Sequence, residues 1–280
     1  MKKVFVFLML IALFIPLCGC VNNPKDLAYQ GLPDGIIEEN EVYTMTCRDG
    51  KLYMKFHKQI ENGSQQSMEA AELYFSSIQE MKQTFEQCNF TDYQLSFLQS
   101  MAKDSSENEL MVLDTKQLWE PEFPEKMEIT QVMFNETGNY SFAFGDSDSK
   151  LRGFISLVNQ ELFQKLIEME YTSFFYNKNI VVDREEFDPD RNAMKYYYHT
   201  SAGSFLYVHY QPTSNEKKLT VIEIYGKIYD TGFEVPHRMI IFGEENGCYY
   251  DLQLYGLSER PSVKWLESFG LKPYVETETQ

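Results

Sequence analysis

Cysteine and histidine are scarce in this chain of 280 residues, which has five Cys and four His. Three of the cysteines, Cys47, Cys88 and Cys248, lie far apart in the body of the chain and in no CxxC pair. Three thiols allow at most one disulfide, which excludes a disulfide framework, and their spacing does not fit a zinc ribbon or a redox pair. We therefore expect them to be small buried hydrophobic residues.

Basic residues are also few, with 25 Lys and Arg against 42 Asp and Glu and a formal net charge of −17. A nucleic-acid partner requires clustered Lys and Arg that neutralise phosphates, and no basic run here is longer than two residues. The composition therefore argues against nucleic-acid binding. The same negative charge opposes docking onto anionic lipids or wall polymers.

The common catalytic motifs are missing, since no GxSxG, HExxH, P-loop or GxGxxG occurs. This argues against the usual hydrolase, zinc protease and nucleotide-binding sites. Ser204 follows Gly203 at a predicted turn, but no neighbouring base is present to activate its hydroxyl. His199 and His209 flank a predicted hairpin, and two imidazoles with a nearby carboxylate would suit zinc, but the ligand set is incomplete.

The segment Asp188-Pro189-Asp190-Arg191-Asn192 has the alternating oxygen spacing of a calcium loop. Ala193 stands where that loop requires glycine, and His199 replaces its bidentate glutamate. The segment is therefore better interpreted as a solvated loop. We predict no metal and no cofactor for this chain.

The strongest signal lies at the N-terminus. Lys2 and Lys3 precede an apolar run from Val4 to Pro16, followed by Leu17-Cys18-Gly19-Cys20. A basic start and a short apolar run are typical of a secretory signal peptide, and the run is shorter than the about 20 apolar residues of a membrane span. The last four of these residues resemble the lipobox of bacterial lipoproteins.

The resemblance implies that residues 1–19 are a signal peptide and that Cys20 carries a diacylglyceryl group on the extracytoplasmic face of the cell membrane. Two acyl chains anchor stably, because each buried CH₂ contributes about 0.8 kcal/mol. Loss of Lys2 and Lys3 would change the formal charge from −17 to −19. Turn-forming Asn, Pro, Gly and Asp residues predict a flexible tether over 20–37. The alternative is an ordinary secreted protein in which Cys20 is incidental.

The remaining body predicts an α+β fold, with antiparallel β-sheets and a few packed helices. Strands and helices come in runs instead of strict βαβ alternation, which favours antiparallel sheets. Pro121 and Pro124 mark the clearest boundary, so we expect two weakly separated lobes, an N-terminal lobe over 38–120 and a β-rich C-terminal lobe over 126–275. Hydrophobic alternation predicts strands at 42–47, 52–56, 110–113, 127–135, 139–145, 151–158, 171–182, 194–199, 204–210, 219–229, 238–242 and 248–255. Asp49-Gly50 predicts a hairpin turn between the first two strands.

Helix starts are marked by capping residues. Ser77 with Glu80 and Thr91 with Gln94 form two capping boxes, and Asn159 caps a third helix. A short terminal helix is predicted from Ser262 to Ser268, with Gly270 as its C′ residue. Two helical turns are not stable alone in water, so we expect Trp265 to be buried against the sheet.

Tyrosine is the most concentrated residue type on the predicted strands between 196 and 255. A tyrosine ring combines apolar area with a hydroxyl, which suits a sugar or peptide at a sheet face. We therefore take Tyr196, Tyr198, Tyr207 and Tyr250 as candidate ligand-binding residues. The alternative is that these rings belong to the core.

These observations predict a non-enzymatic binding or interaction module, anchored to the membrane through Cys20, with a protein, peptide or glycan ligand. The alternative is an envelope hydrolase or enzyme accessory whose site is built from dispersed acidic and tyrosine residues. A deep pocket with two carboxylates of opposite pKa shifts would favour the enzyme. A broad exposed aromatic face would favour binding.

Overall fold

The computed structural model describes residues 32–60, 72–102, 109–124, 126–135, 140–214, 217–226 and 232–275. Within these residues the strands form sheets of ten, four and two strands, and every strand pair is antiparallel. Four helices accompany them in the described residues. The architecture is consistent with the predicted α+β class with antiparallel sheets, and it is richer in strand than we expected.

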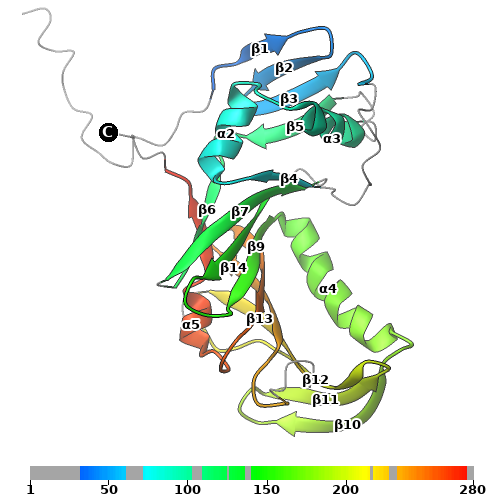
Figure 1. Ribbon diagram of the computed structural model, residues 1–280. Coiled ribbons are helices and arrows are strands. Elements are labelled where there is room, and N and C mark those ends of the chain that lie inside the picture. Colours follow the sequence, from blue (N-terminus) through cyan, green and yellow to red (C-terminus); the bar gives the residue numbers. More distant parts are fainter. Residues whose placement is uncertain are drawn as a thin grey trace, which may run out of the picture.

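The four-stranded sheet has the order β1-β2-β3-β5 and lies at one end of the molecule (Figure 1). Its turn at Asp49 and Gly50 has positive φ angles of 52° and 73°, which confirms the predicted hairpin. The helices α2 and α3 pack between this sheet and β4. The bounds are β1 (Gly35–Glu39), β2 (Tyr43–Arg48), β3 (Lys51–Phe56), β4 (Glu72–Phe75), β5 (Glu109–Asp114), α2 (Ile78–Glu86) and α3 (Asp92–Ala102).

Both predicted helix caps are present, but only the one at Thr91 is a complete capping box, because the Glu80 carboxylate accepts from the Ser76 N–H at 2.8 Å. The Ser77 hydroxyl accepts a hydrogen bond from the Glu80 backbone N–H at 3.1 Å. Gln94 N–H donates to Thr91 Oγ1 at 3.3 Å, while the Thr91 N–H donates to Gln94 Oε1 at 2.9 Å. These bonds satisfy backbone donors that have no partner inside the helix, and so they define where α2 and α3 begin.

The ten-stranded sheet has the order β10-β11-β12-β13-β14-β15-β9-β8-β7-β4 and curves away from the four-stranded sheet (Figure 1). The helix α4 lies along one face of this sheet, and its cap is the predicted Asn159, whose side chain accepts from the Leu162 N–H at 2.8 Å. The bounds are β7 (Met127–Asn135), β8 (Tyr140–Asp146), β9 (Arg152–Val158), α4 (Gln160–Tyr176), β10 (Val181–Asp188), β11 (Ala193–Thr200), β12 (Gly203–Tyr210), β13 (Lys218–Gly226), β14 (Arg238–Glu245) and β15 (Cys248–Tyr255).

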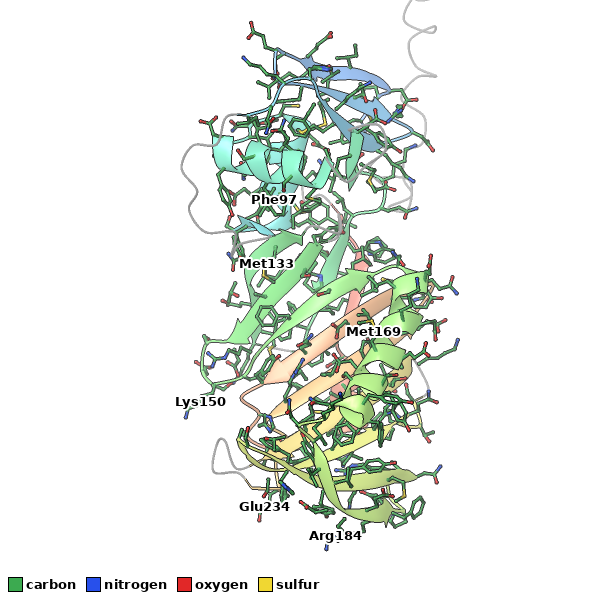
Figure 2. All side chains as sticks on the ribbon, turned by 90° about the vertical axis from the view of Figure 1, so that its right-hand side faces the viewer. Phe97, Met133, Lys150, Met169, Arg184 and Glu234 are labelled. Carbon is green, nitrogen blue, oxygen red and sulfur yellow. The ribbon has the colours of Figure 1, made fainter. Side chains whose placement is uncertain are left out.

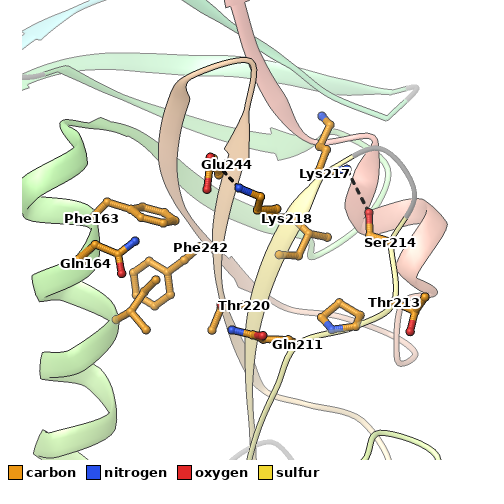
Figure 3. A pocket seen from close by; sticks show the side chains of 13 residues that line it. Phe163, Gln164, Gln211, Thr213, Ser214, Lys217, Lys218, Thr220, Phe242 and Glu244 are labelled. Carbon is orange, nitrogen blue, oxygen red and sulfur yellow. Dashed lines mark hydrogen bonds and ion pairs between the residues drawn. The ribbon is translucent and has the colours of Figure 1, made fainter.

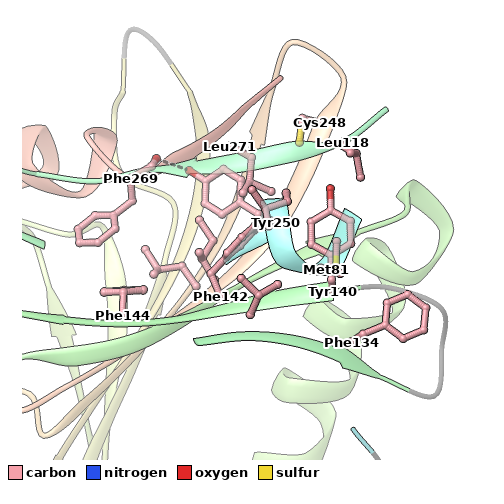
Figure 4. Close-up of a cluster of buried hydrophobic side chains, with 14 of the residues drawn as sticks. Met81, Leu118, Phe134, Tyr140, Phe142, Phe144, Cys248, Tyr250, Phe269 and Leu271 are labelled. Carbon is pink, nitrogen blue, oxygen red and sulfur yellow. Dashed lines mark hydrogen bonds between the residues drawn. The ribbon is translucent and has the colours of Figure 1, made fainter. Parts of the chain in front are cut away.

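Two strand pairs connect the parts of the chain before and after Pro124. β4 pairs with β7 at the edge of the ten-stranded sheet, and β6 (Trp119–Glu122) pairs with β16 (Gly270–Pro273). The short helix α5 (Val263–Glu267) precedes β16. Buried residues from Tyr43 to Leu271 accordingly form one hydrophobic cluster, part of which is shown in Figure 4.

A second, smaller cluster lies between α4 and the sheet, and it contains Phe163, Phe174 and Phe242. Side chains of the strands alternate between this α4 face and the opposite face, which belongs to the larger cluster. On the opposite face, Leu266 of α5 and Phe269, which follows the helix, lie in the core at 1% and 0% exposure. The central strands are therefore covered on both sides.

Several local predictions were wrong. The segment predicted as a strand from 171 is the last part of α4, which continues to Tyr176 because Phe174 docks on the sheet. Packing there outweighs the strand preference of aromatic residues. β1 begins at Gly35, inside the predicted tether. Gly270 opens β16 and is not a helix C′ residue.

The prolines at the predicted boundary lie in and beside a strand. Pro121 belongs to β6 and stands opposite Leu271 of β16. A two-stranded sheet leaves one edge of each strand unpaired, so proline is tolerated there without breaking a ladder bond. Pro121, which we took as part of the boundary between two lobes, therefore lies inside a strand that pairs with β16.

The three described cysteines are all free thiols. Cys47 and Cys248 are buried, as predicted, whereas Cys88 is half-buried. Burial raises the pKa of Cys248 to about 11 and that of Cys88 to about 12. These thiols are therefore protonated at neutral pH and behave as packing groups.

Candidate functional site

The four candidate tyrosines do not form one exposed face. Tyr250 is 1% exposed, points away from α4, and its hydroxyl donates to the Phe269 backbone oxygen at 3.0 Å (Figure 4). Its position on β15 is opposite that of Gly243 on β14, and the ring lies over the glycine. Tyr250 is therefore a core residue, because a large ring fills the space that the missing Cβ leaves.

Tyr196, Tyr198 and Tyr207 lie together on the α4 face. Phe174 of α4 stacks on Tyr207 with ring centroids 4.0 Å apart and contacts Tyr198 at 5.0 Å. Tyr207 and Tyr198 are 3% and 8% exposed, and burial raises the pKa of Tyr198 to about 12. Only Tyr196 stays half-buried, so the core interpretation applies to Tyr198 and Tyr207 as it does to Tyr250.

Exposed apolar side chains gather beside these tyrosines. Of the fifteen large hydrophobic residues that are exposed in the described chain, seven lie between residues 169 and 187, on α4 and β10. Figure 2 shows Met169 on the outer side of α4 and Arg184 at the far end of the sheet. The seven residues, called here the α4–β10 surface, are Met169, Tyr171, Phe175, Tyr176, Val181, Val182 and Phe187.

Ring contacts connect this surface to the buried cluster. Phe175 lies 4.7 Å from Tyr171 and 5.0 Å from Tyr196, measured between ring centroids. On β10, Val182 and Phe187 stand opposite Tyr198 and Met194, and so share the α4 face. The signal that sequence reasoning missed is the i, i+4 spacing of Tyr171 and Phe175, which belongs to a helix.

β10 is the end strand of the ten-stranded sheet and is exposed along all of its length except Asp188. It carries Asp183, Glu185, Glu186 and Asp188 against a single basic residue, Arg184. Charged residues on an edge strand discourage pairing between copies of the same chain. The apolar side chains of the α4–β10 surface therefore have acidic neighbours on β10.

A cavity of about 440 Å³ lies between α4 and the strands β13 and β14 (Figure 3). Phe163 and Phe242 form its apolar wall, and Gln164 and Gln211 contribute amides. At its rim the Lys218 ammonium pairs with the Glu244 carboxylate at 3.1 Å. The cavity is amphiphilic and holds one ion pair.

A second cavity of about 600 Å³ lies between the β8–β9 turn and the segment that leads from β15 into α5. Its lining includes Asp146, Glu259, Arg260 and Trp265. Trp265 is only half-buried, which corrects the prediction that it is fully packed against the sheet. Its exposed part forms one wall of this cavity.

A buried carboxylate lies next to this second cavity. Glu223 of β13 is 0% exposed and pairs with Arg191 and Arg260, each at 2.9 Å. Tyr210 and Tyr225 donate their hydroxyl protons to the same carboxylate at 2.7 and 2.5 Å. Two cations and two hydroxyls thus satisfy one buried charge.

Two other carboxyls have pKa values shifted in opposite directions. Burial raises the pKa of Asp251 to about 6, and the nearby Glu170 adds to the rise. Burial also opposes ionisation of Asp188, but Lys195 and Arg191 outweigh it and lower the pKa of that carboxyl. Neither Asp251 nor Asp188 lines one of the two cavities. The cavities therefore do not contain this pair of carboxyls with opposite pKa shifts.

The two histidines with metal-ligand potential do not converge. His199 pairs with Asp183 at 2.8 Å, whereas His209 lies on the α4 face near Tyr171. The Asp188 carboxylate of the calcium-like segment instead accepts from Arg191 and Lys195 at 2.9 and 3.1 Å. Among the described residues, no group of three or more His, Cys, Asp or Glu is placed to hold a metal.

Comparison with protein families, with curated proteins and with solved structures finds no match to this chain. No relative therefore assigns a role to the two cavities or to the α4–β10 surface. The predicted lipidation site, Cys20, lies outside the residues that the structure describes.

Proposed function

We propose that this chain is a membrane-anchored extracytoplasmic lipoprotein that acts as a non-enzymatic binding module, with the α4–β10 surface as its partner site. The observation that carries the proposal is the concentration of exposed apolar side chains at that surface. Exposed apolar side chains that gather in one region of a protein often mark a site for a partner.

The partner chemistry follows from the surroundings of the surface. Tyr171 and Phe175 offer aromatic faces, while Glu185 and Glu186 on the neighbouring strand are acidic. A polypeptide with apolar and basic side chains complements both features, because aromatic residues supply affinity and charge complementarity supplies specificity. The high acidic content of the chain favours the same class of partner.

Membrane attachment rests on the lipobox-like residues Leu17-Cys18-Gly19-Cys20. None of the helices in the described residues is long and apolar enough to cross a bilayer. In the proposal a lipid on Cys20 supplies the attachment, and residues 21–34 connect it to β1.

The two-lobe organisation, 38–120 and 126–275, belongs to the same proposal. It is supported by the separate sheet formed by β1, β2, β3 and β5. β4 and β6 precede Pro124 and pair with strands that follow it, so such lobes would share one core.

Attachment is tested by Cys20→Ser, with Cys18→Ser as the matched control. We expect Cys20→Ser to leave the precursor uncut or to move the protein out of the membrane fraction, whereas Cys18→Ser should behave as the unaltered chain. Cell fractionation measures membrane retention, and mass spectrometry of the N-terminus shows whether the precursor has been cleaved. Normal processing and membrane retention of Cys20→Ser would defeat the anchoring proposal.

The partner site is tested by photo-crosslinking in cells. A photoreactive residue replaces Tyr176 on the α4–β10 surface or Tyr93 on α3, which are 80% and 54% exposed. We expect a discrete adduct from position 176 only, and its loss when Tyr171→Ser and Phe175→Ser are added. No adduct at position 176, or the same adduct from both positions, would reject this surface as the partner site.

A further inference from the structure

The cavity beside α5 has a rigid floor. Gly256, with φ of +73°, brings the segment after β15 against the β8–β9 turn, and a Cβ at this position would lie 2.2 Å from the Lys150 backbone oxygen. Figure 2 shows Lys150 at the tip of that turn. Because only glycine fits here, the two segments that bound the cavity can approach each other closely.

One wall of this cavity is the indole of Trp265. The ring is supported from behind by Phe269, with centroids 4.7 Å apart and planes at 72°. The Ser262 hydroxyl accepts a hydrogen bond from the backbone N–H of Trp265 at 3.2 Å and so caps the start of α5. A half-buried indole that is supported on one side presents a flat apolar surface to whatever occupies the cavity.

Arg260 provides a second fixed group. Its Nε donates to Glu223 at 2.9 Å and its Nη2 donates to Tyr210 at 3.1 Å. These bonds orient the guanidinium before any ligand arrives, and within the described residues they leave Nη1 for another acceptor. Preorganised donors bind with a smaller entropy cost than mobile ones.

The remaining polar groups of the cavity are balanced in charge. Asp146 and Glu259 contribute two carboxylates, and Arg260 and Lys150 contribute two cations. The hydroxyls of Ser149, Ser258 and Ser262 also line it. Donors and acceptors without a dominant sign suit a neutral ligand that carries many hydroxyls, and a flat indole suits the C–H face of a pyranose ring.

We propose that this cavity is a binding site for a neutral oligosaccharide, in which a sugar ring stacks on Trp265 and its hydroxyls bond to Arg260 and Glu259. The cavity between α4 and β13 has no tryptophan, and its Lys218–Glu244 pair is already formed, so it lacks this combination. The site is separate from the α4–β10 surface and does not depend on it.

The indole itself reports binding. In a Trp119→Phe background, Trp265 is the sole tryptophan, and its emission is followed during titration with chitotetraose, cellotetraose and maltotetraose. We expect a saturable change with at least one of these sugars at concentrations up to about 10 mM. Sorbitol, which has hydroxyls but no ring face, serves as the control and should give no saturable change.

Substitutions in the two cavities test where the oligosaccharide binds. Glu259→Ala should weaken the sugar by about tenfold, the effect of losing one hydrogen bond to a charged group, while Lys218→Ala in the other cavity should leave the affinity unchanged. Trp265→Ala should abolish binding measured by calorimetry, and near-ultraviolet circular dichroism checks that each variant is folded. Absence of saturable binding with all three sugars, or binding unaffected by Glu259→Ala and Trp265→Ala, would overturn the proposal.

Discussion

Arg260 and Glu223 are 37 positions apart in the sequence, yet the arginine Nε donates to the glutamate Oε1 at 2.9 Å. Glu223 is completely buried, and Arg191 contacts its other oxygen from the β10–β11 turn. Burial alone would lower the pKa of Arg260, but the charge of Glu223 outweighs this effect and raises it. The Arg260–Glu223 ion pair connects the segment before α5 to β13 of the ten-stranded sheet.

Replacing the buried carboxylate should be costly. Glu223→Leu leaves Arg260 without its counter-charge and removes one of the two carboxylates that Arg191 contacts, so it should lower the free energy of unfolding by about 3–5 kcal/mol. Equilibrium urea unfolding measures the change. Glu161→Ala removes the exposed pair with Lys165 and should cost no more than about 0.5 kcal/mol. Equal effects of the two substitutions would show that the network does not stabilise the fold.

Asp251 should make stability depend on pH. Its pKa is about 6 in the folded protein and about 3.9 in an unfolded chain, so the folded state binds the proton more tightly. This stabilisation is complete below about pH 4 and is lost as the pH rises through 6, by roughly 3 kcal/mol.

The measurement for Asp251 is urea unfolding at several values between pH 4 and 7. Asp251→Asn should flatten the curve over this range, because its side chain does not titrate. Asp183→Asn, at an exposed carboxylate on β10, is the matched control and should keep the dependence. An identical pH profile for Asp251→Asn and the unaltered protein would contradict the assignment.

Gly243 should resist substitution even though it lies within a strand. A Cβ there would meet the Tyr250 ring at 2.0 Å, so Gly243→Ala should destabilise the fold by about 1–3 kcal/mol. At Gly145, the nearest atom would be 3.5 Å away, and Gly145→Ala should change stability by less than about 0.5 kcal/mol. Thermal unfolding ranks the two variants, and the reverse order would refute the close packing of Tyr250.

The terminal helix should be anchored by Phe269 more than by Trp265. Phe269 is 0% exposed, so Phe269→Ala should cost about 3–5 kcal/mol of unfolding free energy. Trp265 is half-buried, and its replacement by Ala should cost less. Urea unfolding followed by far-ultraviolet circular dichroism compares them. A larger loss for Trp265→Ala would mean that the indole, not the phenyl ring, holds α5.

Local signals in the sequence predicted much of the secondary structure. The Asp49-Gly50 turn and the caps at Ser77, Thr91 and Asn159 are all present, because each involves residues within a few positions of one another. The strands β7, β8, β9, β12 and β15 also begin and end close to the predicted positions, since alternation reflects a single buried face.

The end of α4 and the strand β10 were not predictable in this way. Tyr171, Phe174 and Phe175 favour strand by residue type, and the i, i+4 spacing of Tyr171 and Phe175 is the local sign of a helix, which the contact of Phe174 with Tyr207 then stabilises. The sequence of β10 does not alternate between apolar and polar residues. β10 is an exposed edge strand, so neither of its faces has to be apolar.

Patterns among neighbouring residues were enough to predict the antiparallel α+β character and most element boundaries, and to identify the lipobox-like motif at Cys20. The burial of Tyr198, Tyr207 and Tyr250 in the core could be seen only in the folded chain. The same is true of the contact between Arg260 and Glu223 and of the pairing of β4 with β7. The physical reason is that strand order and cross-sheet burial depend on contacts between residues distant in sequence, which no local pattern encodes.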